Sequence, residues 1–210
     1  MDDKKYIILD AMGVIFEEKD DFREVFMPSL KEKTRIYGEC NKVQIIESAY
    51  LNLTLSNISS QQFFKQLGIT NPSLDFLLNL TLNPEFSDFS ARIKNRKEFN
   101  LAVLSNDSQE WANYRNYKLG LNKIIPFYIT SSLFGVRKPD RKVYEKLCWL
   151  LRTSPENCIY IDNLDSNLQE PKNLGMRVIR FGDGDNERYM GVQDFNELYN
   201  LLTENEYVRV

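Results

Sequence analysis

Five short apolar runs along the chain have the length and composition of buried β-strands. They lie at residues 6–9, 101–104, 127–130, 158–161 and 177–181. Between the later runs, apolar residues recur at intervals of three and four over residues 108–119, 141–152, 164–174 and 192–202, which indicates amphipathic helices. Strands that alternate with helices are typical of βαβ units. The pattern therefore predicts an α/β fold, a doubly wound and mostly parallel sheet with helices on both faces.

The segment after the first run breaks this alternation. Up to the second run the chain reads almost wholly as helix, with Phe22, Val25, Phe26 and Leu30 at helical spacing. We therefore expect a small helical insert over residues 17–88, and an α/β core made of residues 1–16 and 89–210. An insert at this point lies over the carboxyl ends of the strands, where open α/β sheets bind their ligands.

The composition is that of an ordinary folded domain. The chain has 210 residues, of which 42% are hydrophobic and 27% charged, and this length suffices for a buried core. The formal net charge is −3 and no basic stripe is present, so we expect no nucleic-acid partner. The composition says nothing about the oligomeric state.

Several features predict a cytoplasmic protein. No apolar run approaches the length of a membrane span, and the opening "MDDKK" leads directly into a strand, so we expect neither a membrane anchor nor a signal peptide. The cysteines Cys40, Cys148 and Cys158 are odd in number and lack C-x-x-C spacing, which is typical of reduced thiols.

Histidine is absent from the chain. This excludes catalytic triads with an imidazole base and zinc sites with histidine ligands. Any acid or base chemistry must therefore use carboxylates, lysines, tyrosines or cysteines.

Polar residues stand where three of the expected strands end. They are Asp10 after the first run, Ser105 and Asn106 after the second, and Asp162 and Asn163 after the fourth. Residues at the carboxyl ends of parallel strands point into the ligand crevice, so we expect these side chains to lie together. Lys138 is a further candidate, because it precedes a proline suited to the first turn of a helix.

Taken in order, these residues resemble the four motifs of the haloacid dehalogenase superfamily. "DAMGV" at Asp10 is similar to the first motif, D-x-D-x-T/V, and "LAVLSND" at Ser105 to the second. "KPD" at Lys138 is similar to the third, and "YIDNLDSN" at Asp162 to the fourth, with Asn163 in place of the second acid. The insert is similar to the family's small helical cap. The resemblance covers nearly the whole chain and implies a Rossmann-like core.

The resemblance implies a Mg²⁺-dependent hydrolase that acts on a small phosphorylated metabolite. Asp10 would be the nucleophile, and Lys138 would hold both this nucleophile and the developing negative charge. The phosphate-binding residues would be Ser105, Asn106 and Lys138. The Mg²⁺ ligands would be Asp10, Met12 through its backbone carbonyl, Asp162, Asn163 and Asn167.

The charges of these residues give an independent reason to expect a metal. Asp10, Asp162 and Lys138 together carry −1, which would repel a phosphate dianion, whereas the same site with Mg²⁺ carries +1. At ~4 Å and an effective dielectric constant of ~20, each pair of unit charges interacts by roughly 4 kcal/mol, so the metal decides the sign of the site. Carboxylate and carbonyl oxygens suit Mg²⁺.

Met12 stands where phosphatases of this family carry the acid that protonates the leaving oxygen and later activates water. A methionine can do neither, and the loss of such a group typically costs ~10²- to 10⁴-fold in rate. The expected activity is therefore weakened, and restricted to substrates with good leaving groups unless an insert acid substitutes. The candidate acids are Glu17, Glu18, Asp20 and Asp21.

Two alternative functions remain open. One is a metal-independent hydrolase similar to the haloacid dehalogenases, in which Asp10 attacks carbon and Arg23 or Arg35 supplies an arginine from the insert. The other is a non-catalytic relative that binds a phosphorylated ligand or a protein partner. Met12 and Asn163 both favour the second alternative, whereas retention of Asp162 counts against the first.

Overall fold

A parallel six-stranded sheet forms the centre of the computed structural model, which describes residues 4–20, 22–36, 38–183 and 188–204. The strand order is β3-β2-β1-β4-β5-β6, and every neighbouring pair is parallel. The strands are β1 (Lys5–Leu9), β2 (Phe99–Ser105), β3 (Phe127–Thr130), β4 (Cys158–Asp162), β5 (Arg177–Phe181) and β6 (Gly191–Val192). The five predicted strands are confirmed. The sixth was not predicted, because two residues leave no readable pattern.

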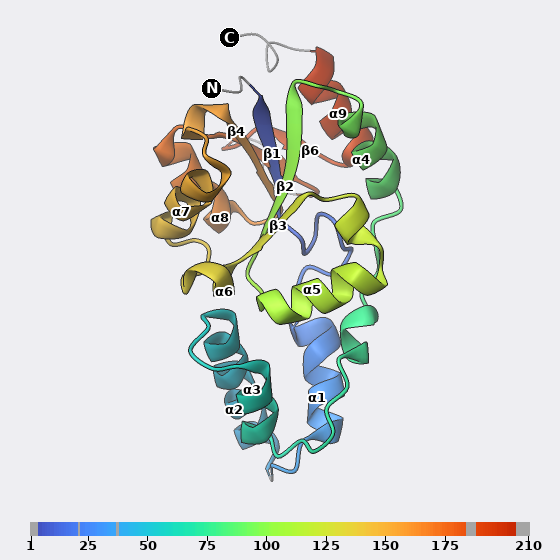
Figure 1. Cartoon of the computed structure of the whole chain (residues 1–210), viewed down its shortest axis with the longest axis vertical. Coiled ribbons are helices and arrows are strands. Elements are labelled where there is room, and N and C mark those ends of the chain that lie inside the picture. The colour runs from blue at the N-terminus through green and yellow to red at the C-terminus, as the bar shows by residue number, and fades with distance from the viewer. Residues whose placement is uncertain (1–3, 21, 37, 184–187, 205–210) are drawn as a thin grey trace.

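Helices cover both faces of this sheet, which confirms the predicted doubly wound α/β class (Figure 1). Successive residues of β1 point to opposite faces, so that Ile7 and Leu9 belong to one apolar core and Ile8 to the other. The first core takes side chains from α4 (Phe86–Lys94), α5 (Gln109–Lys118) and α9 (Phe195–Glu204). The second takes them from α7 (Arg141–Leu151) and α8 (Asp165–Leu174).

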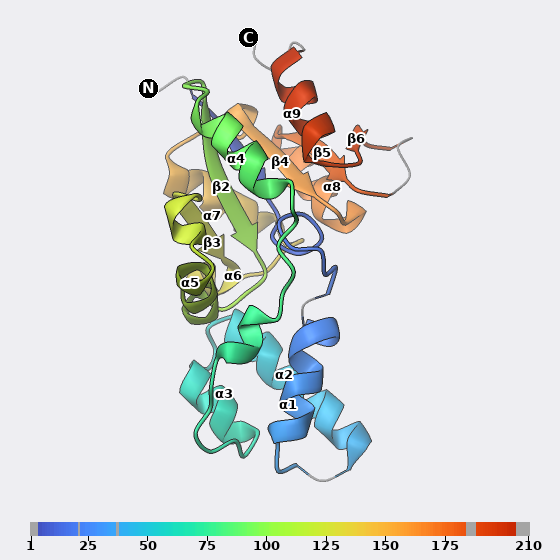
Figure 2. The same ribbon diagram turned by 90° about the vertical axis from the view of Figure 1, so that its right-hand side faces the viewer.

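The long connection from β1 to β2 forms a group of helices that stands beyond the carboxyl ends of the strands (Figures 1 and 2). These elements are a π-helix (Phe22–Phe26), α1 (Met27–Lys33), α2 (Glu39–Thr54), α3 (Ser60–Gln66) and a 3₁₀-helix (Asp75–Leu78). We call residues 17–85 the insert. The expected boundary at residue 88 falls inside α4, whose Phe86 and Phe89 pack with the sheet core and contact Phe195 of α9.

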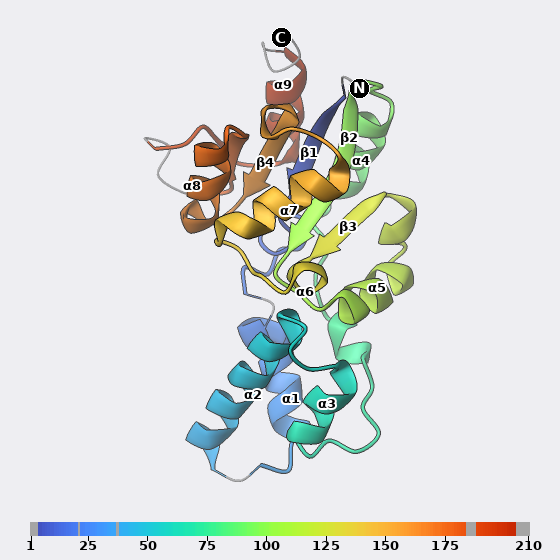
Figure 3. The same cartoon turned by 60° about the vertical axis from the view of Figure 1, so that its left-hand side comes forward.

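The end of α2 is bonded to the core. It meets the short helix α6 (Ser131–Phe134), as Figure 3 shows. The Ser131 hydroxyl donates a hydrogen bond to the Thr54 carbonyl at 2.8 Å, and the Ser56 hydroxyl donates one to the Ser132 carbonyl at 2.6 Å. These bonds hold the insert over the strand ends. The remaining short elements are the 3₁₀-helices Leu121–Lys123 and Pro155–Asn157.

Trp111 of α5 ties the insert to the core by apolar packing. Its side chain is fully buried, and its indole N–H donates a hydrogen bond to Ser60 Oγ at 2.8 Å. Five aromatic rings of the insert lie around it: Phe26, Tyr50, Phe63, Phe64 and Phe76. Buried aromatic side chains contribute large apolar areas, so this cluster is a main source of cohesion between insert and core.

The features that bear on location are few. In the part of the chain that the structure describes, no helix combines the length and the apolarity that a membrane span needs. Cys148 and Cys158 are buried free thiols, while the side chain of Cys40 lies outside the described part. The cytoplasmic location stays a prediction from the sequence.

We expect Trp111→Ala to lower the free energy of unfolding by about 3–5 kcal/mol, because it removes the ring at the centre of the cluster. Trp149 is 78% exposed, so the control Trp149→Ala should change stability by no more than about 0.5 kcal/mol. Urea unfolding followed by far-ultraviolet circular dichroism gives both values. Equal losses in the two variants would contradict the role of the cluster.

Candidate active site

Asp10 directly follows β1, whose last three residues are buried. Ile7, Ile8 and Leu9 are fully buried, and the Asp10 N–H donates to the Ile161 carbonyl at 2.8 Å, which extends the pairing of β1 with β4 by one residue. The Ala11 N–H donates to Asp10 Oδ1 at 2.6 Å. Strand pairing and this bond together orient the carboxylate, whose Oδ2 accepts no hydrogen bond from any described residue.

Lys138 joins the ends of β1 and β4. Its Nζ lies 2.7 Å from Asp10 Oδ1 and 3.0 Å from Asp162 Oδ2. The side chain of Asn106 clamps the lysine backbone, because its Oδ1 accepts from the Lys138 N–H at 2.8 Å and its Nδ2 donates to the Lys138 carbonyl at 3.1 Å. Asp10, Asn106 and Asp162, which were predicted from three separate motifs, thus all contact Lys138 of the fourth.

The carboxylate of Asp162 is saturated with hydrogen bonds. Oδ2 accepts from Lys138 Nζ and from the Tyr160 hydroxyl at 2.7 Å, and Oδ1 accepts from the Leu164 N–H at 2.9 Å. Asn167 Nδ2 donates to both oxygens, at 3.2 and 3.1 Å. Asp162 is fully buried. In this arrangement Asp162 and Asn167 position the lysine.

Ser105 ends β2 beside the same lysine. Its side chain is buried, and its hydroxyl forms no hydrogen bond with another described residue. Ser105 pairs with Thr130 of β3 in the sheet, so its backbone position is fixed. The hydroxyl is therefore available to a ligand at the strand ends.

The turn after Asp10 packs against the start of the loop after β4. Gly13 has φ +72°, and a Cβ placed on it would lie 2.1 Å from Asn163 Nδ2, so only glycine fits here. The Asn163 carbonyl accepts from Arg180 Nε at 2.8 Å. Asn163 Oδ1 is buried and has no hydrogen-bond partner among the described residues.

Burial and mutual charge shift the pKa values at this site. Burial, assisted by the Asp162 carboxylate, raises the pKa of Asp10 from 3.8 to about 7, while Lys138 opposes the rise. Burial alone would lower the pKa of Lys138, but the two carboxylates more than offset it, so this pKa lies above its ordinary value. Burial and the Asp162 charge raise the pKa of Tyr160 well above its ordinary value, which keeps its hydroxyl a donor.

The donor atoms fit a hard cation held by few protein ligands. Among the described residues no three acidic, cysteine or histidine side chains form a cluster able to hold a metal ion. Asp162 is already saturated, and Asn167 presents its nitrogen to Asp162. The oxygens that remain are the Asp10 carboxylate, the Met12 carbonyl, Asn167 Oδ1 and Asn163 Oδ1, of which the last two accept no hydrogen bond from the described residues. Such a set suits Mg²⁺, which usually keeps several waters.

A cavity of about 520 Å³ opens in front of these residues, between the sheet and the insert. The core contributes Asp10, Met12, Ser105, Asn106, Arg137, Lys138, Leu164 and Asn167 to its wall. The insert contributes Lys19, Asp20, Phe22, Arg23, Glu47, Tyr50 and Leu51. The rings of Phe22 and Tyr50 stack with centroids 4.2 Å apart. The volume suits a small-molecule substrate.

Of the four insert acids considered as a replacement acid, Asp20 lines the cavity. Glu18 instead accepts a hydrogen bond from the Thr81 N–H, Glu17 does not belong to the cavity wall, and Asp21 lies outside the described residues. Asp20 also forms an ion pair with Arg23, Oδ2 to Nε at 3.6 Å.

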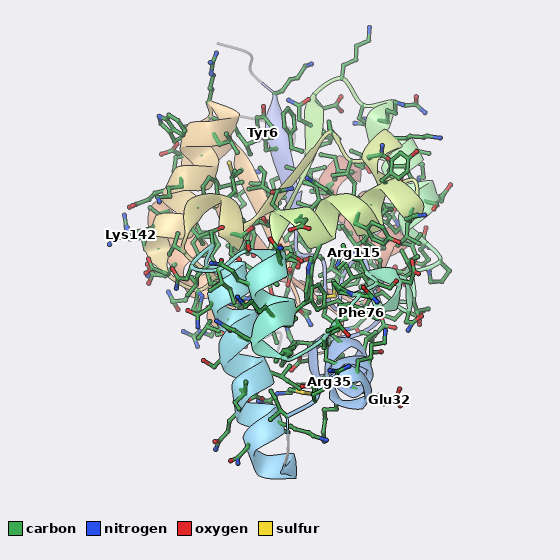
Figure 4. All side chains as sticks on the ribbon, turned by 60° about the horizontal axis from the view of Figure 1, so that its bottom comes forward. Tyr6, Glu32, Arg35, Phe76, Arg115 and Lys142 are labelled. Atoms are coloured by element: carbon green, nitrogen blue, oxygen red, sulfur yellow. The ribbon has the colours of Figure 1, made fainter. Side chains whose placement is uncertain are left out.

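Of the two arginines considered for a dehalogenase, Arg23 lines the cavity. Arg35 follows α1 and lies on the insert near Glu32, away from the cavity wall (Figure 4). The guanidinium of Arg23 is already paired with two acids, Asp20 and Glu47.

Sequence reasoning missed several residues of this site. Tyr160 was not predicted, because a tyrosine within a buried strand is expected to be an ordinary residue of the apolar core. Glu47 and Tyr50 reach the cavity only through the tertiary position of α2. Arg137 had a usable signal, since it adjoins Lys138 in the sequence.

Comparison with known families gives a consistent result. A family model described as haloacid dehalogenase-like hydrolase matches residues 4–175. Bifunctional epoxide hydrolase 2 of Sus scrofa is 27% identical over 107 residues, which cover 47% of this chain and 19% of that protein. The match thus spans a small part of this relative.

Solved structures with the same fold include both phosphatases and dehalogenases. A HAD phosphatase from Thermococcus onnurineus has a TM-score of 0.73 and 16% identity, covering 95% of this chain and 98% of its own. A HAD family enzyme from Bacteroides thetaiotaomicron, in complex with magnesium and inorganic phosphate, has a TM-score of 0.68 and 14% identity, covering 87% and 96%. The L-2-haloacid dehalogenase from Xanthobacter autotrophicus, with chloropropionic acid covalently bound, has a TM-score of 0.65 and 16% identity, covering 95% and 98%. At these identities the likeness shows the fold alone.

We expect Asp10→Asn to stabilise the metal-free protein. A carboxyl group whose pKa rises from 3.8 to about 7 on folding costs stability as the pH increases through that interval, because the folded state must ionise a buried group. The increase in melting temperature of Asp10→Asn over wild type should therefore be larger at about pH 8 than at about pH 4. Both proteins are measured in EDTA at each pH. A variant less stable than wild type at the higher pH would contradict this account of the Asp10 charge.

Proposed function

The chain belongs to the haloacid dehalogenase-like hydrolase family, and from this premise we propose that it is a phosphatase in which Asp10 attacks the phosphorus of a small phosphorylated metabolite. As a member of this family it is an enzyme. The predicted family resemblance is thereby confirmed, whereas the substrate class and the roles of single residues are our proposal.

One observation carries the proposal: Lys138 Nζ touches both Asp10 and Asp162 at the wall of a cavity that also exposes Ser105 and Asn106. A nucleophilic carboxylate, a fixed cation and the uncommitted Ser105 hydroxyl around one space are groups that phosphoryl transfer requires, while the Asn106 side chain holds the lysine backbone.

In the first step, Asp10 Oδ2 forms a bond to phosphorus while the bond from phosphorus to the leaving oxygen breaks with its electron pair. Asp10 Oδ1 stays bound to the Ala11 N–H and to Lys138, which fixes the attack direction. The Ser105 hydroxyl and the Lys138 ammonium stabilise the phosphoryl oxygens. In the second step, water attacks the phosphorus of the aspartyl phosphate, which releases inorganic phosphate and restores Asp10.

We propose that Mg²⁺ binds through Asp10, the Met12 carbonyl and Asn163. When bound, it supplies positive charge that stabilises the oxygens of the transferred group. Asp162, expected from the sequence as a ligand, is assigned instead to holding Lys138, because its two oxygens already accept from Lys138, Tyr160, Leu164 and Asn167. Asn167 donates to Asp162 through Nδ2, but its Oδ1 accepts no hydrogen bond from the described residues and the residue lines the cavity, so Asn167 stays a fourth proposed ligand. Asn163 is neutral, whereas the motif has an acid at this position. The proposed ligands therefore offer Mg²⁺ one negative charge, that of Asp10, rather than two, so we expect weak binding of the metal.

Met12 restricts the reaction to substrates that need no proton donor. An acyl phosphate expels a carboxylate that is stable without protonation, whereas an alkyl phosphate must expel an alkoxide. Asp20 is the acid of the insert best placed to compensate. The same substitution slows the second step, because methionine cannot activate water.

The phosphatase is favoured over a dehalogenase by the state of Arg23. The dehalogenase hypothesis takes the arginine for the substrate carboxylate from the insert, but Arg23 is paired with Asp20 and Glu47, and Arg35 is not part of the cavity wall. A non-catalytic role would leave unexplained a carboxylate held beside a lysine with one oxygen uncommitted.

With Mg²⁺, we expect wild type to hydrolyse acetyl phosphate and Asp10→Asn to lose this activity. Met12→Asp restores the missing acid and should raise turnover of 4-nitrophenyl phosphate by roughly 10²-fold or more. Met12→Asn, which adds no titratable group, is the matched control. Release of phosphate and of nitrophenol gives the rates.

Activity that persists in EDTA, or equal activity in wild type and Asp10→Asn, would contradict the proposal. EDTA-resistant release of halide from a 2-haloacid would favour the dehalogenase instead.

A further inference from the structure

The charge balance at the candidate site depends on a residue outside the recognised motifs. Asp10 and Asp162 carry two negative charges, and Lys138 is shared between them. A phosphate entering the metal-free cavity would meet a net charge of −1. Arg137 lines the same cavity, next to Lys138, and brings this balance to zero.

Arg137 differs from the other cations of the cavity wall. Arg23 is 71% exposed at its side chain and is paired with two carboxylates, and Lys19 is exposed. Arg137 is half-buried, and none of the carboxylates in residues 4–20, 22–36, 38–183 and 188–204 forms an ion pair with it. Its positive charge is therefore not neutralised by the protein in that part of the chain.

The position of the guanidinium is set from two sides. Arg137 Nη1 donates a hydrogen bond to Thr54 Oγ1, at the end of α2 in the insert. Thr54 is fully buried, and its carbonyl accepts from the Ser131 hydroxyl at 2.8 Å. On the core side, the clamp between Asn106 and the Lys138 backbone fixes the adjoining chain.

We propose that Arg137 is a substrate-binding residue that contacts the phosphoryl oxygens, and that Thr54 is the residue that positions it. This inference rests on the proposed phosphatase function and deepens it. A guanidinium presents a planar set of N–H donors that matches phosphate oxygens and keeps its charge at any working pH. One of these donors is used by Thr54, and the others are left for the ligand.

Because Thr54 belongs to the insert, the proposal links substrate binding to the position of the insert. The strand ends supply the nucleophile, whereas the insert orients one of the anion-binding groups. The arginine binds ground state and transition state alike, so its loss should raise KM more than it lowers kcat.

The test is binding of inorganic phosphate by calorimetry at low ionic strength, with and without Mg²⁺. We expect Arg137→Gln to raise the Kd by about 10-fold to 100-fold, since a bond between charged partners is lost. Arg137→Lys keeps the charge but loses the planar donors, so its Kd should lie between those of wild type and Arg137→Gln. The matched control is Arg141→Gln, because Arg141 is an exposed residue of α7 paired with Glu145 outside the cavity. Its Kd should stay within about twofold of wild type.

Thr54→Val tests the positioning role, because valine keeps the shape of threonine and removes the acceptor. We expect the KM for acetyl phosphate to rise a few-fold with kcat unchanged. Circular dichroism and melting temperature confirm that each variant is folded.

The two proposals fail in different ways. If wild type hydrolyses acetyl phosphate but binds phosphate as tightly as Arg137→Gln does, the inference about Arg137 is wrong and the phosphatase stands. If wild type binds phosphate through Arg137 but hydrolyses nothing, the inference stands and the phosphatase proposal is wrong. If wild type does not bind phosphate, the inference is also wrong.

Discussion

The contact of the Lys138 ammonium with Asp10 and Asp162 is the interaction on which the rest of the site depends. It joins three segments far apart in the sequence, the ends of β1 and β4 and the loop before α7, at distances of 2.7 and 3.0 Å. Removing three charges from water is costly, and the mutual attraction offsets this only where further hydrogen bonds satisfy the charges. Tyr160, Asn167 and the Leu164 N–H supply those bonds to Asp162, while one oxygen of Asp10 accepts no hydrogen bond from the described residues. In the proposed mechanism, this asymmetry between the two carboxylates makes Asp10 the reactive one.

The insert turns this charged edge into a binding site. Without it, the strand ends would face open solvent, where electrostatic interactions are weakened. The aromatic cluster around Trp111 and the bonds from Thr54 and Ser56 hold the insert in place, and its residues form half of the cavity wall. The cavity therefore combines the proposed catalytic groups of the sheet with side chains of the insert.

The sequence was sufficient for those parts of the structure that follow from local pattern. Apolar runs predicted five strands. The polar residues at strand ends, together with the lysine before a proline, pointed to Asp10, Asp162 and Lys138, which are in contact in the structure. Which role each residue has within the site could not be predicted from the sequence. Asp162 and Asn167 were expected to bind a metal, which stays a prediction; the hydrogen bonds from Lys138 and Asn167 to Asp162 arise only when β4 and α8 pack together. Arg137 likewise gains its place from Thr54, which is 83 residues away in the chain. The expected end of the insert at residue 88 falls inside α4, because an amphipathic helix has the same sequence pattern whether it packs on an insert or on a sheet.

The central claim is that Asp10 forms a bond to phosphorus, and the most direct measurement is mass spectrometry of the acid-quenched enzyme after brief mixing with acetyl phosphate and Mg²⁺. Because Met12 cannot activate water, the aspartyl phosphate should accumulate. The account predicts a phosphoryl adduct on the peptide that contains Asp10, with none in Asp10→Asn. Hydrolysis of acetyl phosphate without an adduct at any time point, or an adduct on another residue, would contradict it.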